Sequence, residues 1–239
     1  MAKSHAHSIN ACRSVGAILA ASIVLSGCTR GLEDAGRLDQ IWGRRGLMPG
    51  QMVKPRAIAI DEQDDVFLVD RRAKMQVYDP DGEFLREWDT PTHEYGRPSG
   101  LAFDHDQNLL VADSHYHRVL KYDRQGKLLH TIGGDSELDP ATDTPLDGVF
   151  GYVCDVAVDS QGHLFVAESQ QEERISKLDP TGAAIVIQWG GRGPAPGQFQ
   201  RIRALDFDDQ DRLYVADACK SIGELSYPDD VAVAPDQTI

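Results

Sequence analysis

Short apolar runs alternate with polar turns along most of the chain, and the stretch 95–129, YGRPSGLAFDHDQNLLVADSHYHRVLKYDRQGKLL, shows the pattern most clearly. Apolar alternation predicts four short strands here, at 101–103, 109–112, 119–122 and 127–132. The intervening polar segments are rich in Asp, Asn and Gly, which are typical residues of hairpin turns. We therefore expect this stretch to fold as a four-stranded antiparallel sheet, and the chain to be all-β.

The same unit recurs. An aspartate closes the first predicted strand of each copy, at Asp61, Asp104, Asp159 and Asp208. An acidic residue follows each of them nine positions later, at Asp70, Asp113, Glu168 and Asp217. The aspartates lie 43, 55 and 49 residues apart, which suits four-stranded blades repeated around an axis better than paired helices. The predicted blades span about 38–88, 89–134, 135–190 and 191–222, with a partial fifth at 223–239.

Two further positions that recur in the repeats are typical of stacked blades. Large apolar residues stand nine positions before the aspartates, at Met52, Tyr95, Phe150 and Phe199, and we expect them to plug the space between neighbouring blades. Alanine stands two positions before them, at Ala59, Ala102 and Ala157, between larger apolar residues such as Ile58 and Ile60. Such alternation suits a crowded axis. In the fourth copy this place holds Asp206, which is expected either to face a ligand or to be paired by Arg201 or Arg203.

At these columns the chain resembles the NHL-repeat family of β-propellers. The segment VADSHYHRVLKY matches the consensus Asn-His-Arg-Ile-like turn with Tyr116, His117, Arg118 and Val119. Looser matches lie at 173–175 and 74–76, and in the former glutamate takes the histidine place. The resemblance covers about 38–239 and implies an all-β, NHL-type propeller. About four blades and part of a fifth are recognisable, as in an incomplete six-bladed ring.

The N-terminal residues read as a targeting segment. Residues 1–27 combine a basic start, through Lys3 and Arg13, with an apolar run too short to span a bilayer. The sequence Leu-Ser-Gly-Cys ending at Cys28 resembles a bacterial lipobox, which implies cleavage before Cys28 and acylation of its thiol. An ordinary signal peptide is the alternative. We expect a tether at 28–37 and a lipid-anchored protein on the periplasmic face of the bacterial cell envelope, at the outer membrane rather than the inner.

The net charge limits the classes of partner that the chain is expected to bind. The 239 residues carry 24 Lys and Arg against 38 Asp and Glu, a formal net charge of −14. Loss of the targeting segment would remove two basic and no acidic residues. So acidic a surface repels phosphate backbones, and we expect no nucleic acid as partner. The excess acid also fits a plain solvated exterior.

Candidate metal and cysteine chemistry is sparse. The enzyme alternative is a metal-dependent lyase resembling peptidyl-α-hydroxyglycine amidating lyase, a family that holds zinc with three histidines. Among the histidines after residue 27, His115 and His117 alone are close in sequence, and they could supply two ligands at most. The segment at 104–108 begins like a calcium-binding loop, but it lacks the glycine and the final glutamate. We therefore expect no cofactor, with zinc or calcium as the alternative. Whether Cys154 and Cys219 pair stays open, with free thiols favoured.

A binding role is the leading hypothesis. Polar residues at the entry of each first strand should surround one mouth of the central channel, and they include Lys54, Arg56, Arg97, Tyr152, Arg201 and Arg203, with Asp206 nearby. Clustered arginines are typical of a binding site for an anionic ligand or a peptide carboxylate. The alternative is that they pair with Asp155, Asp206 and Asp230 between blades. The sequence thus predicts a non-enzymatic binding or scaffolding module whose partner is a protein, a peptide or a small molecule.

Overall fold

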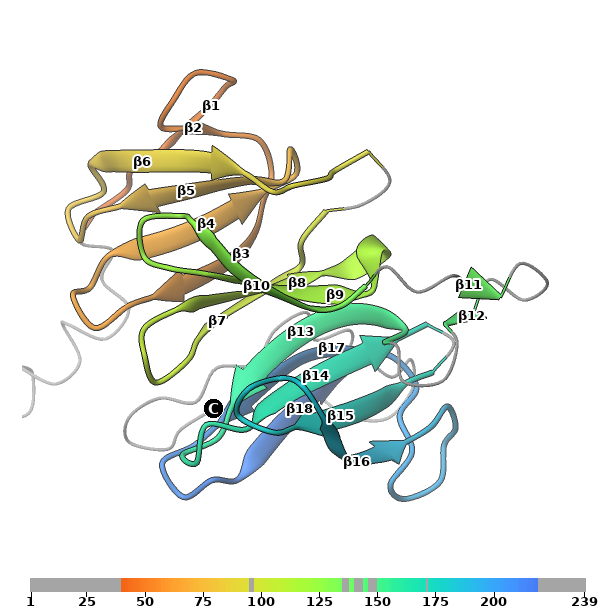
Figure 1. The fold of residues 1–239 in the computed structure, drawn as a ribbon. Helices are drawn as coiled ribbons and strands as arrows, with labels where there is room; N and C mark the ends of the chain where they lie inside the picture. Colours follow the sequence, from red (N-terminus) through yellow and green to blue (C-terminus); the bar gives the residue numbers. More distant parts are fainter. Residues whose placement is uncertain are drawn as a thin grey trace, which may run out of the picture. The chain divides into compact units, whose positions relative to one another are not determined.

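The computed structural model describes residues 40–94, 97–134, 138–139, 144–145, 150–170 and 172–218. Its main body, within the compact unit Gly43–Ile239, consists of antiparallel sheets joined in sequence order (Figure 1). Sheet I contains β3 (Pro55–Ile60), β4 (Val66–Asp70), β5 (Lys74–Tyr78) and β6 (Phe84–Asp89). Sheet II contains β7 (Gly100–Phe103), β8 (Leu109–Asp113), β9 (Arg118–Tyr122) and β10 (Leu128–Gly133). The all-β prediction is confirmed.

Sheet III contains β13 (Tyr152–Val158), β14 (Leu164–Ser169), β15 (Arg174–Leu178) and β16 (Ile185–Gly190). Sheet IV has two described strands, β17 (Ile202–Phe207) and β18 (Leu213–Asp217). The short strands β1 (Arg44–Arg45) and β2 (Gln51–Met52) pair in parallel, and β11 (Leu138–Asp139) pairs with β12 (Thr144–Pro145). A 3-10 turn, η1 (Ser114–Tyr116), joins β8 to β9. In the described part of the chain no helix is long and apolar enough to span a membrane.

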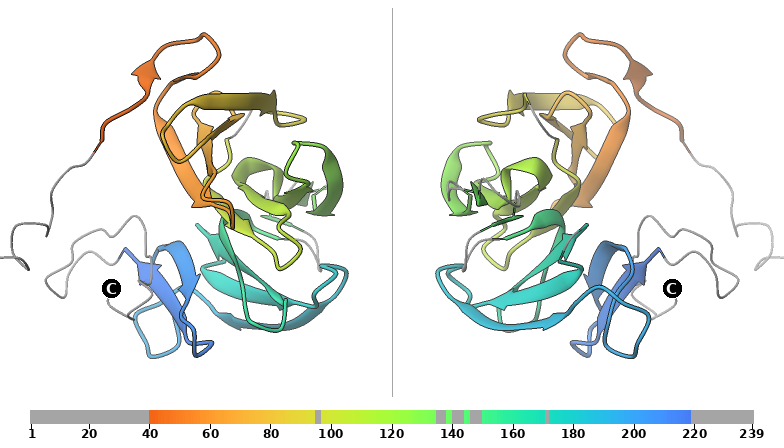
Figure 2. Two further views of the ribbon diagram at one scale, coloured as in Figure 1. Left: turned by 90° about the vertical axis from the view of Figure 1, so that its left-hand side faces the viewer. Right: turned by 90° about the vertical axis from the view of Figure 1, so that its right-hand side faces the viewer.

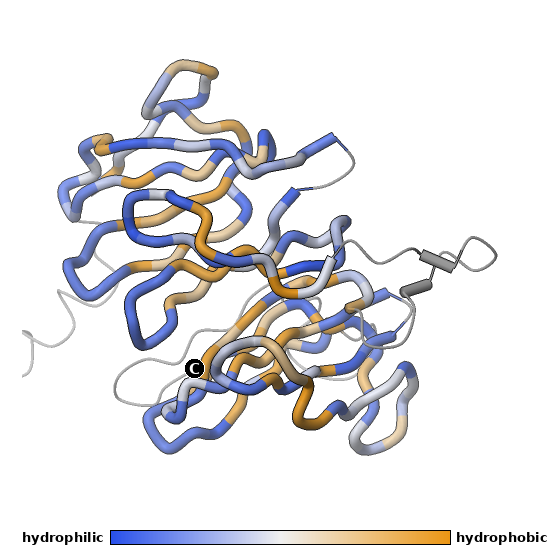
Figure 3. Tube along the Cα trace, viewed as in Figure 1, coloured by the Kyte–Doolittle hydropathy of each residue, from blue (hydrophilic) through white to orange (hydrophobic). Residues whose placement is uncertain are grey.

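The core lies between successive sheets rather than within one of them. The first strands of neighbouring sheets contact one another, β3 with β7, β7 with β13, and β13 with β17 (Figure 2). Three apolar clusters fill these interfaces, with Phe67 against Leu120, Leu110 against Val166, and Phe165 against Leu205 as representative members. Each such side chain stabilises the fold by about 1.5 to 3 kcal/mol on burial. Figure 3 shows the hydrophobic residues concentrated in the strands and the hydrophilic ones in the turns.

The repeated aspartates are turn residues. In every copy the first carboxylate accepts backbone N–H bonds from the residues two and four positions later, as Asp159 does from Gln161 and His163 at 3.0 and 2.8 Å. The residue three positions later has a positive φ in each copy, at Asp64, Gln107, Gly162 and Asp211. The spacing of the repeats thus reflects one hairpin turn used four times.

In three of the four copies the second acidic residue holds the chain that enters the first strand. Backbone N–H groups eight positions before the turn aspartate donate to it, Val53 to Asp70 at 2.8 Å, Gly151 to Glu168 at 2.6 Å and Gln200 to Asp217 at 3.0 Å. Arginines pair with three of these acids, Arg72 with Asp70, Arg118 with Asp113 and Arg174 with Glu168. Much of the acidic composition is therefore structural.

Two of the predicted aromatic plugs are in place. Phe150 packs between sheets II and III, and Phe199 packs against the cluster between sheets III and IV. A Cβ at Gly133 would lie 2.7 Å from the Phe150 ring, and one at Gly190 would lie 2.8 Å from the Phe199 ring. Both glycines also have positive φ, so an L side chain would be strained there in addition. Tyr95, the equivalent in the second copy, lies outside the described residues.

The large apolar residues beside the alanine position are packed in sheets II, III and IV, but they are exposed in sheet I. Ile58 and Ile60 are 55% and 59% exposed, whereas the equivalents Val156 and Leu205 are 2% and 5% exposed. The reason is positional, because Val156 and Leu205 face the preceding four-stranded sheet, and no four-stranded sheet precedes sheet I among the described strands. The predicted targeting segment 1–27, Cys28 and the predicted partial repeat 223–239 lie outside the described residues.

Candidate functional site

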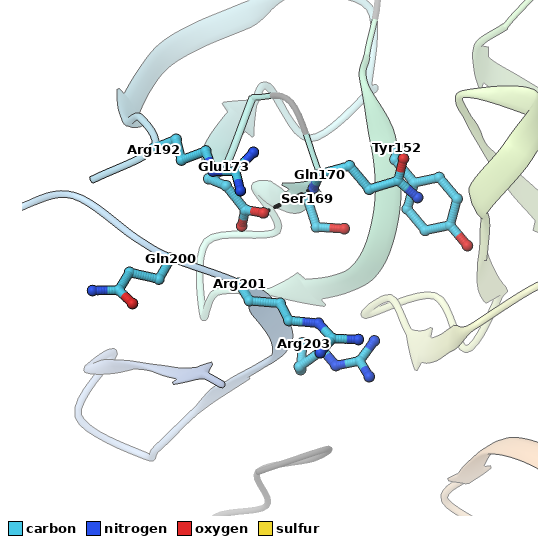
Figure 4. A pocket seen from close by; sticks show the side chains of 8 residues that line it. All are labelled: Tyr152, Ser169, Gln170, Glu173, Arg192, Gln200, Arg201 and Arg203. Carbon is cyan, nitrogen blue, oxygen red and sulfur yellow. Dashed lines mark hydrogen bonds between the residues drawn. The ribbon is translucent and has the colours of Figure 1, made fainter. Parts of the chain in front are cut away.

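A polar cavity of about 470 Å³ opens at the start of the first strands of sheets III and IV. Its lining is rich in arginine and amide groups and consists of Tyr152, Ser169, Gln170, Glu173, Arg192, Gln200, Arg201 and Arg203. Figure 4 shows the side chains of Arg201 and Arg203 extending from the start of β17 into the same part of the lining, and Arg192 and Glu173 in another part of it. Of the seven predicted binding residues, Tyr152, Arg201 and Arg203 line this cavity.

β-Bulges set the direction of several of these side chains. The pairing register shifts at one residue in the first strands of sheets I, III and IV, so that Arg56, Cys154 and Arg203 each fall between two regularly paired neighbours, whereas β7 of sheet II pairs without a shift. All three occupy the same place in the repeat, five positions before the turn aspartate. A bulge bends the strand and re-aims the extra side chain, and bulges often occur beside functional sites. Three of the four repeats therefore supply one re-aimed position, and two of these three residues are arginine.

The backbone beneath Arg201 is held by Asp217. The carboxylate of Asp217 accepts N–H bonds from Gln200 at 3.0 Å and from Arg201 at 2.6 Å. Both bonds are made by the main chain, and the structure gives the Arg201 side chain no hydrogen-bond partner among the described residues. The fold thus fixes the backbone at Arg201, while the N–H donors of its guanidinium have no hydrogen-bond partner among the described residues.

Glu173 is the one carboxylate in the lining and is committed to the protein. It is 3% exposed, and its two oxygens accept the N–H groups of Gln170 and Ile202, each at 2.9 Å. Burial raises the pKa of Glu173, against the effect of these two hydrogen bonds. Glu173 has a positive φ of 44°, as His117 and Ala73 have just before the third strands of sheets II and I. We infer that Glu173 braces the cavity wall and joins β17 to sheet III.

Arginines in the described chain fall into two groups by their partners. Arg72, Arg118, Arg124, Arg174 and Arg212 pair with carboxylates, whereas Arg44, Arg45, Arg71 and Arg86 form no ion pair within the described residues. Arg56, Arg97, Arg192 and Arg201 form no ion pair within the described residues. One Asp155 oxygen accepts the Leu205 N–H at 2.8 Å, and neither Asp155 nor Arg203 is without a further partner, so pairing of Arg203 with an acidic residue stays an alternative. Asp206 likewise accepts the N–H of Phe207 at 2.8 Å. Asp230 lies outside the described part.

The remaining predicted residues divide into two groups. Arg56 and Arg97 do not line the cavity, but each guanidinium is fixed through Nε, to the Pro98 carbonyl at 2.9 Å and to the Arg71 carbonyl respectively. Lys54 is exposed and lies in a turn of positive φ, outside the cavity. Asp206 is not in the lining either.

Sequence reasoning missed His115 as a neighbour of the site. Its ring meets the Tyr152 ring edge to face, with centroids 4.8 Å apart and planes at 75°. Burial, followed by the charges of His117, Arg56 and Arg97, lowers the pKa of His115. His115 thus connects the cavity residue Tyr152 with the arginines of the first two sheets. The contact joins β13 to η1, and no local pattern in the sequence could have indicated it.

Metal and thiol candidates are placed as follows. His117 Nδ1 lies 2.8 Å from the Gly151 carbonyl oxygen, and no group of three His, Cys, Asp or Glu side chains gathers in metal-binding fashion anywhere in the described ranges. Cys154 is buried as a free thiol, and burial raises its pKa. Cys219 lies outside the described residues.

Comparison with solved structures assigns the architecture. A virginiamycin B lyase from Staphylococcus aureus with quinupristin superposes with a TM-score of 0.54 at 15% identity, over 72% of this chain and 51% of that one. A structural genomics protein from Bacteroides thetaiotaomicron gives 0.56 at 17% identity, over 68% and 44%. A gluconolactonase from Xanthomonas campestris gives 0.51 at 15% identity, over 72% and 57%. The fold is a β-propeller. The propeller chain spans about half the length of these structures, and identities this low show the fold alone.

Sequence comparison adds one curated relative. The propeller is 24% identical over 107 residues to the protein brain tumor of Drosophila melanogaster, which is 44% of this chain and 10% of that protein. No protein-family model matches the chain. The repeat columns of the sequence and the repeated sheets of the structure therefore agree at the level of the propeller.

Proposed function

We propose that this propeller is a lipid-anchored, extracytoplasmic binding module that takes a small anionic ligand or a peptide carboxylate at the mouth of its channel. One observation carries the proposal. Arg192 and Arg201, which form no ion pair within the described residues, line one cavity of a protein whose formal net charge is −14. With so many acids available, cations left without one favour an external anion.

The size and lining of the cavity fit such a ligand. A volume of about 470 Å³ lies within the range of small-molecule sites, roughly 300 to 1,000 Å³. Guanidinium groups bind carboxylate or phosphate oxygens through two parallel N–H bonds, and Arg201 and Arg203 both contribute such groups to the cavity lining. Ser169, Gln170 and Gln200 add neutral hydrogen-bonding groups that orient a polar ligand.

Binding suits the lining better than catalysis does. Glu173 has both carboxylate oxygens engaged by backbone N–H groups, which suits a brace better than a proton carrier. The lyase alternative has no specific observation in its favour among the described residues, where no three potential zinc ligands gather. The membrane anchor is proposed from the lipobox-like sequence before Cys28, and the absence of nucleic acid among the partners is proposed from the acidic charge.

The test is calorimetric titration of the full chain with inorganic phosphate and with N-acetylglycine, a minimal peptide carboxylate. Arg56→Ala combined with Arg203→Ala removes two cations of the mouth. The matched control is Arg44→Ala with Arg45→Ala, which removes two exposed cations from β1. Each charge-assisted hydrogen bond is worth about 1.5 to 3 kcal/mol. We therefore expect at least a tenfold loss of affinity in the first variant and less than a twofold change in the control.

Melting temperatures and circular dichroism of both variants establish that the fold is intact. Arg201→Ala provides a second, exposed site variant in case the loss of Arg203 disturbs β17. Equal affinities in the site and control variants would overturn the proposal. So would the failure of wild-type protein to bind either anion at millimolar concentration.

A further inference from the structure

One side of sheet I, the side that faces away from sheet II, is covered over its outer strands. In sheet III the equivalent side packs against sheet II, through residues such as Leu178 of β15. Tyr78 of β5 takes the place of Leu178 in sheet I, and β2 covers it. The Gln51 carbonyl oxygen of β2 accepts an N–H bond from the Gln76 side chain at 2.8 Å, and Gln76 in turn accepts the Tyr78 hydroxyl at 2.7 Å. Gln76 and Tyr78 are buried as a result.

The first strand of sheet I stays uncovered on the same side. Ile58 and Ile60 of β3 are both more than half exposed, and they share one face because they lie two residues apart along a strand. Val156, the equivalent of Ile58 in sheet III, is buried against sheet II. Leu47 and Met48, in the loop between β1 and β2, are exposed as well. Exposed apolar side chains gathered in this way mark a contact surface.

The two ends of β3 carry opposite charges. Lys54 directly precedes the strand and Glu62 follows it by two residues, and both are exposed. Neither forms an ion pair within the described residues. Ile58 lies midway between them, four residues from each. A two-fold axis close to Ile58 would therefore bring Lys54 of one copy opposite Glu62 of a second copy, at both ends of the contact.

We propose that this side of sheet I is the interface of a symmetric dimer, in which β3 of one copy packs antiparallel against β3 of a second copy. The isoleucines meet at the centre, and the two pairs of Lys54 with Glu62 flank them. A two-fold interface uses the same patch on both partners, and this patch is complementary to itself in charge and in apolar character. The interface is independent of the proposed ligand site, because that cavity belongs to sheets III and IV.

A head-to-tail contact between sheet I and sheet IV of a second copy fits the residues less well. Within the chain, the residue that faces sheet IV from the alanine position of sheet III is Ala157. In sheet IV the same position holds Asp206, so this contact would place a carboxylate against Ile58 and Ile60. Moving a carboxylate into an apolar contact is costly. The symmetric arrangement puts its charged residues at the rim instead.

The first experiment is sedimentation equilibrium of the full chain, as wild type and with Ile58→Glu combined with Ile60→Glu. We expect a wild-type dimer, and a dissociation constant raised at least about tenfold in the variant because two carboxylates would enter an apolar contact. The matched control is Val186→Glu combined with Ile187→Glu, which adds the same charge at two similarly exposed apolar residues of β16. The control should leave the dissociation constant within about twofold of the wild-type value.

A charge exchange tests the symmetric register. Lys54→Glu and Glu62→Lys each place like charges opposite one another in their own dimers, so each variant alone should associate about fivefold more weakly or worse. An equal mixture of the two should restore the wild-type affinity, because both contacts of the mixed dimer then join opposite charges. These residues lie outside β3, so this pair of variants decides if the isoleucine variant has a lowered melting temperature.

Three results would overturn the inference. A wild-type chain that remains monomeric at all concentrations would exclude the dimer. A dimer weakened equally by the isoleucine variant and by its control on β16 would place the interface elsewhere. Charge variants whose mixture associates no better than either alone would exclude the antiparallel pairing of β3 across a two-fold axis.

Discussion

Replacing Glu168 by glutamine tests the buried acidic braces of the propeller. The Glu168 side chain is fully buried and accepts the Gly151 N–H at 2.6 Å, the Ser176 hydroxyl and two N–H groups of Arg174 at 3.0 Å. Glutamine has nearly the same shape but only one acceptor oxygen. Its NH2 group would therefore face N–H or O–H donors that previously bonded to a carboxylate oxygen. Breaking a buried charge pair costs about 3 to 5 kcal/mol, and we take the lower end because Arg174 is partly exposed and can be rehydrated.

The expected loss is therefore about 3 kcal/mol, which lowers the melting temperature of a domain this size by roughly 6 to 12 °C. Thermal and guanidinium unfolding followed by tryptophan fluorescence measures it. The matched control is Glu172→Gln, because Glu172 pairs with the same arginine at 3.3 Å from a more exposed position. Such a pair is worth less than about 1 kcal/mol. Equal destabilisation by the two substitutions would refute the assignment of Glu168 as a brace.

Two further predictions concern the turns and the anchor. Burial alone would raise the pKa of Asp159, but hydrogen bonds from the His163 N–H and the Lys177 ammonium outweigh it and lower the pKa. The resulting stabilisation is present above the unfolded-state pKa of about 3.9 and is lost as the pH falls through the folded-state pKa. The melting temperature of Asp159→Asn should therefore fall less steeply between about pH 5 and pH 3 than that of the wild type. An unchanged slope would contradict this prediction. For the anchor, Cys28→Ala should move the protein from the membrane fraction to the soluble fraction and abolish incorporation of labelled palmitate, and continued labelling would exclude Cys28 as the lipidated residue.

The repeated architecture was predictable because its chemistry is local. The turn at Asp104 is specified by residues within four positions of it, and the same applies at Asp159. A spacing of nine to the second acid then follows from one hairpin of constant length. Phe150 and Phe199 were identifiable as plugs for a related reason, since each keeps a constant offset from its turn.

The features that sequence reasoning missed depend on neighbours in space. Ile58 has the same pattern as Val156, yet it is exposed because burial at this position requires a preceding sheet. The contact of His115 with Tyr152 joins two sheets and has no signature in either segment. Nor does composition distinguish Arg201 from Arg174, although one lines a cavity and the other pairs with a buried glutamate. Counting positions within the repeat could select Arg201, but it could not show which residues or ligands this side chain contacts.

The most direct test of the cationic mouth is a crystal of the full chain soaked in selenate, with data collected at the selenium edge. Selenate is an oxyanion that Arg201 and Arg203 are expected to bind, and its anomalous signal locates it without reference to the protein. We predict the strongest peak within hydrogen-bonding distance of the guanidinium groups of Arg201 and Arg203. An empty cavity with selenate bound elsewhere on the surface would contradict the account.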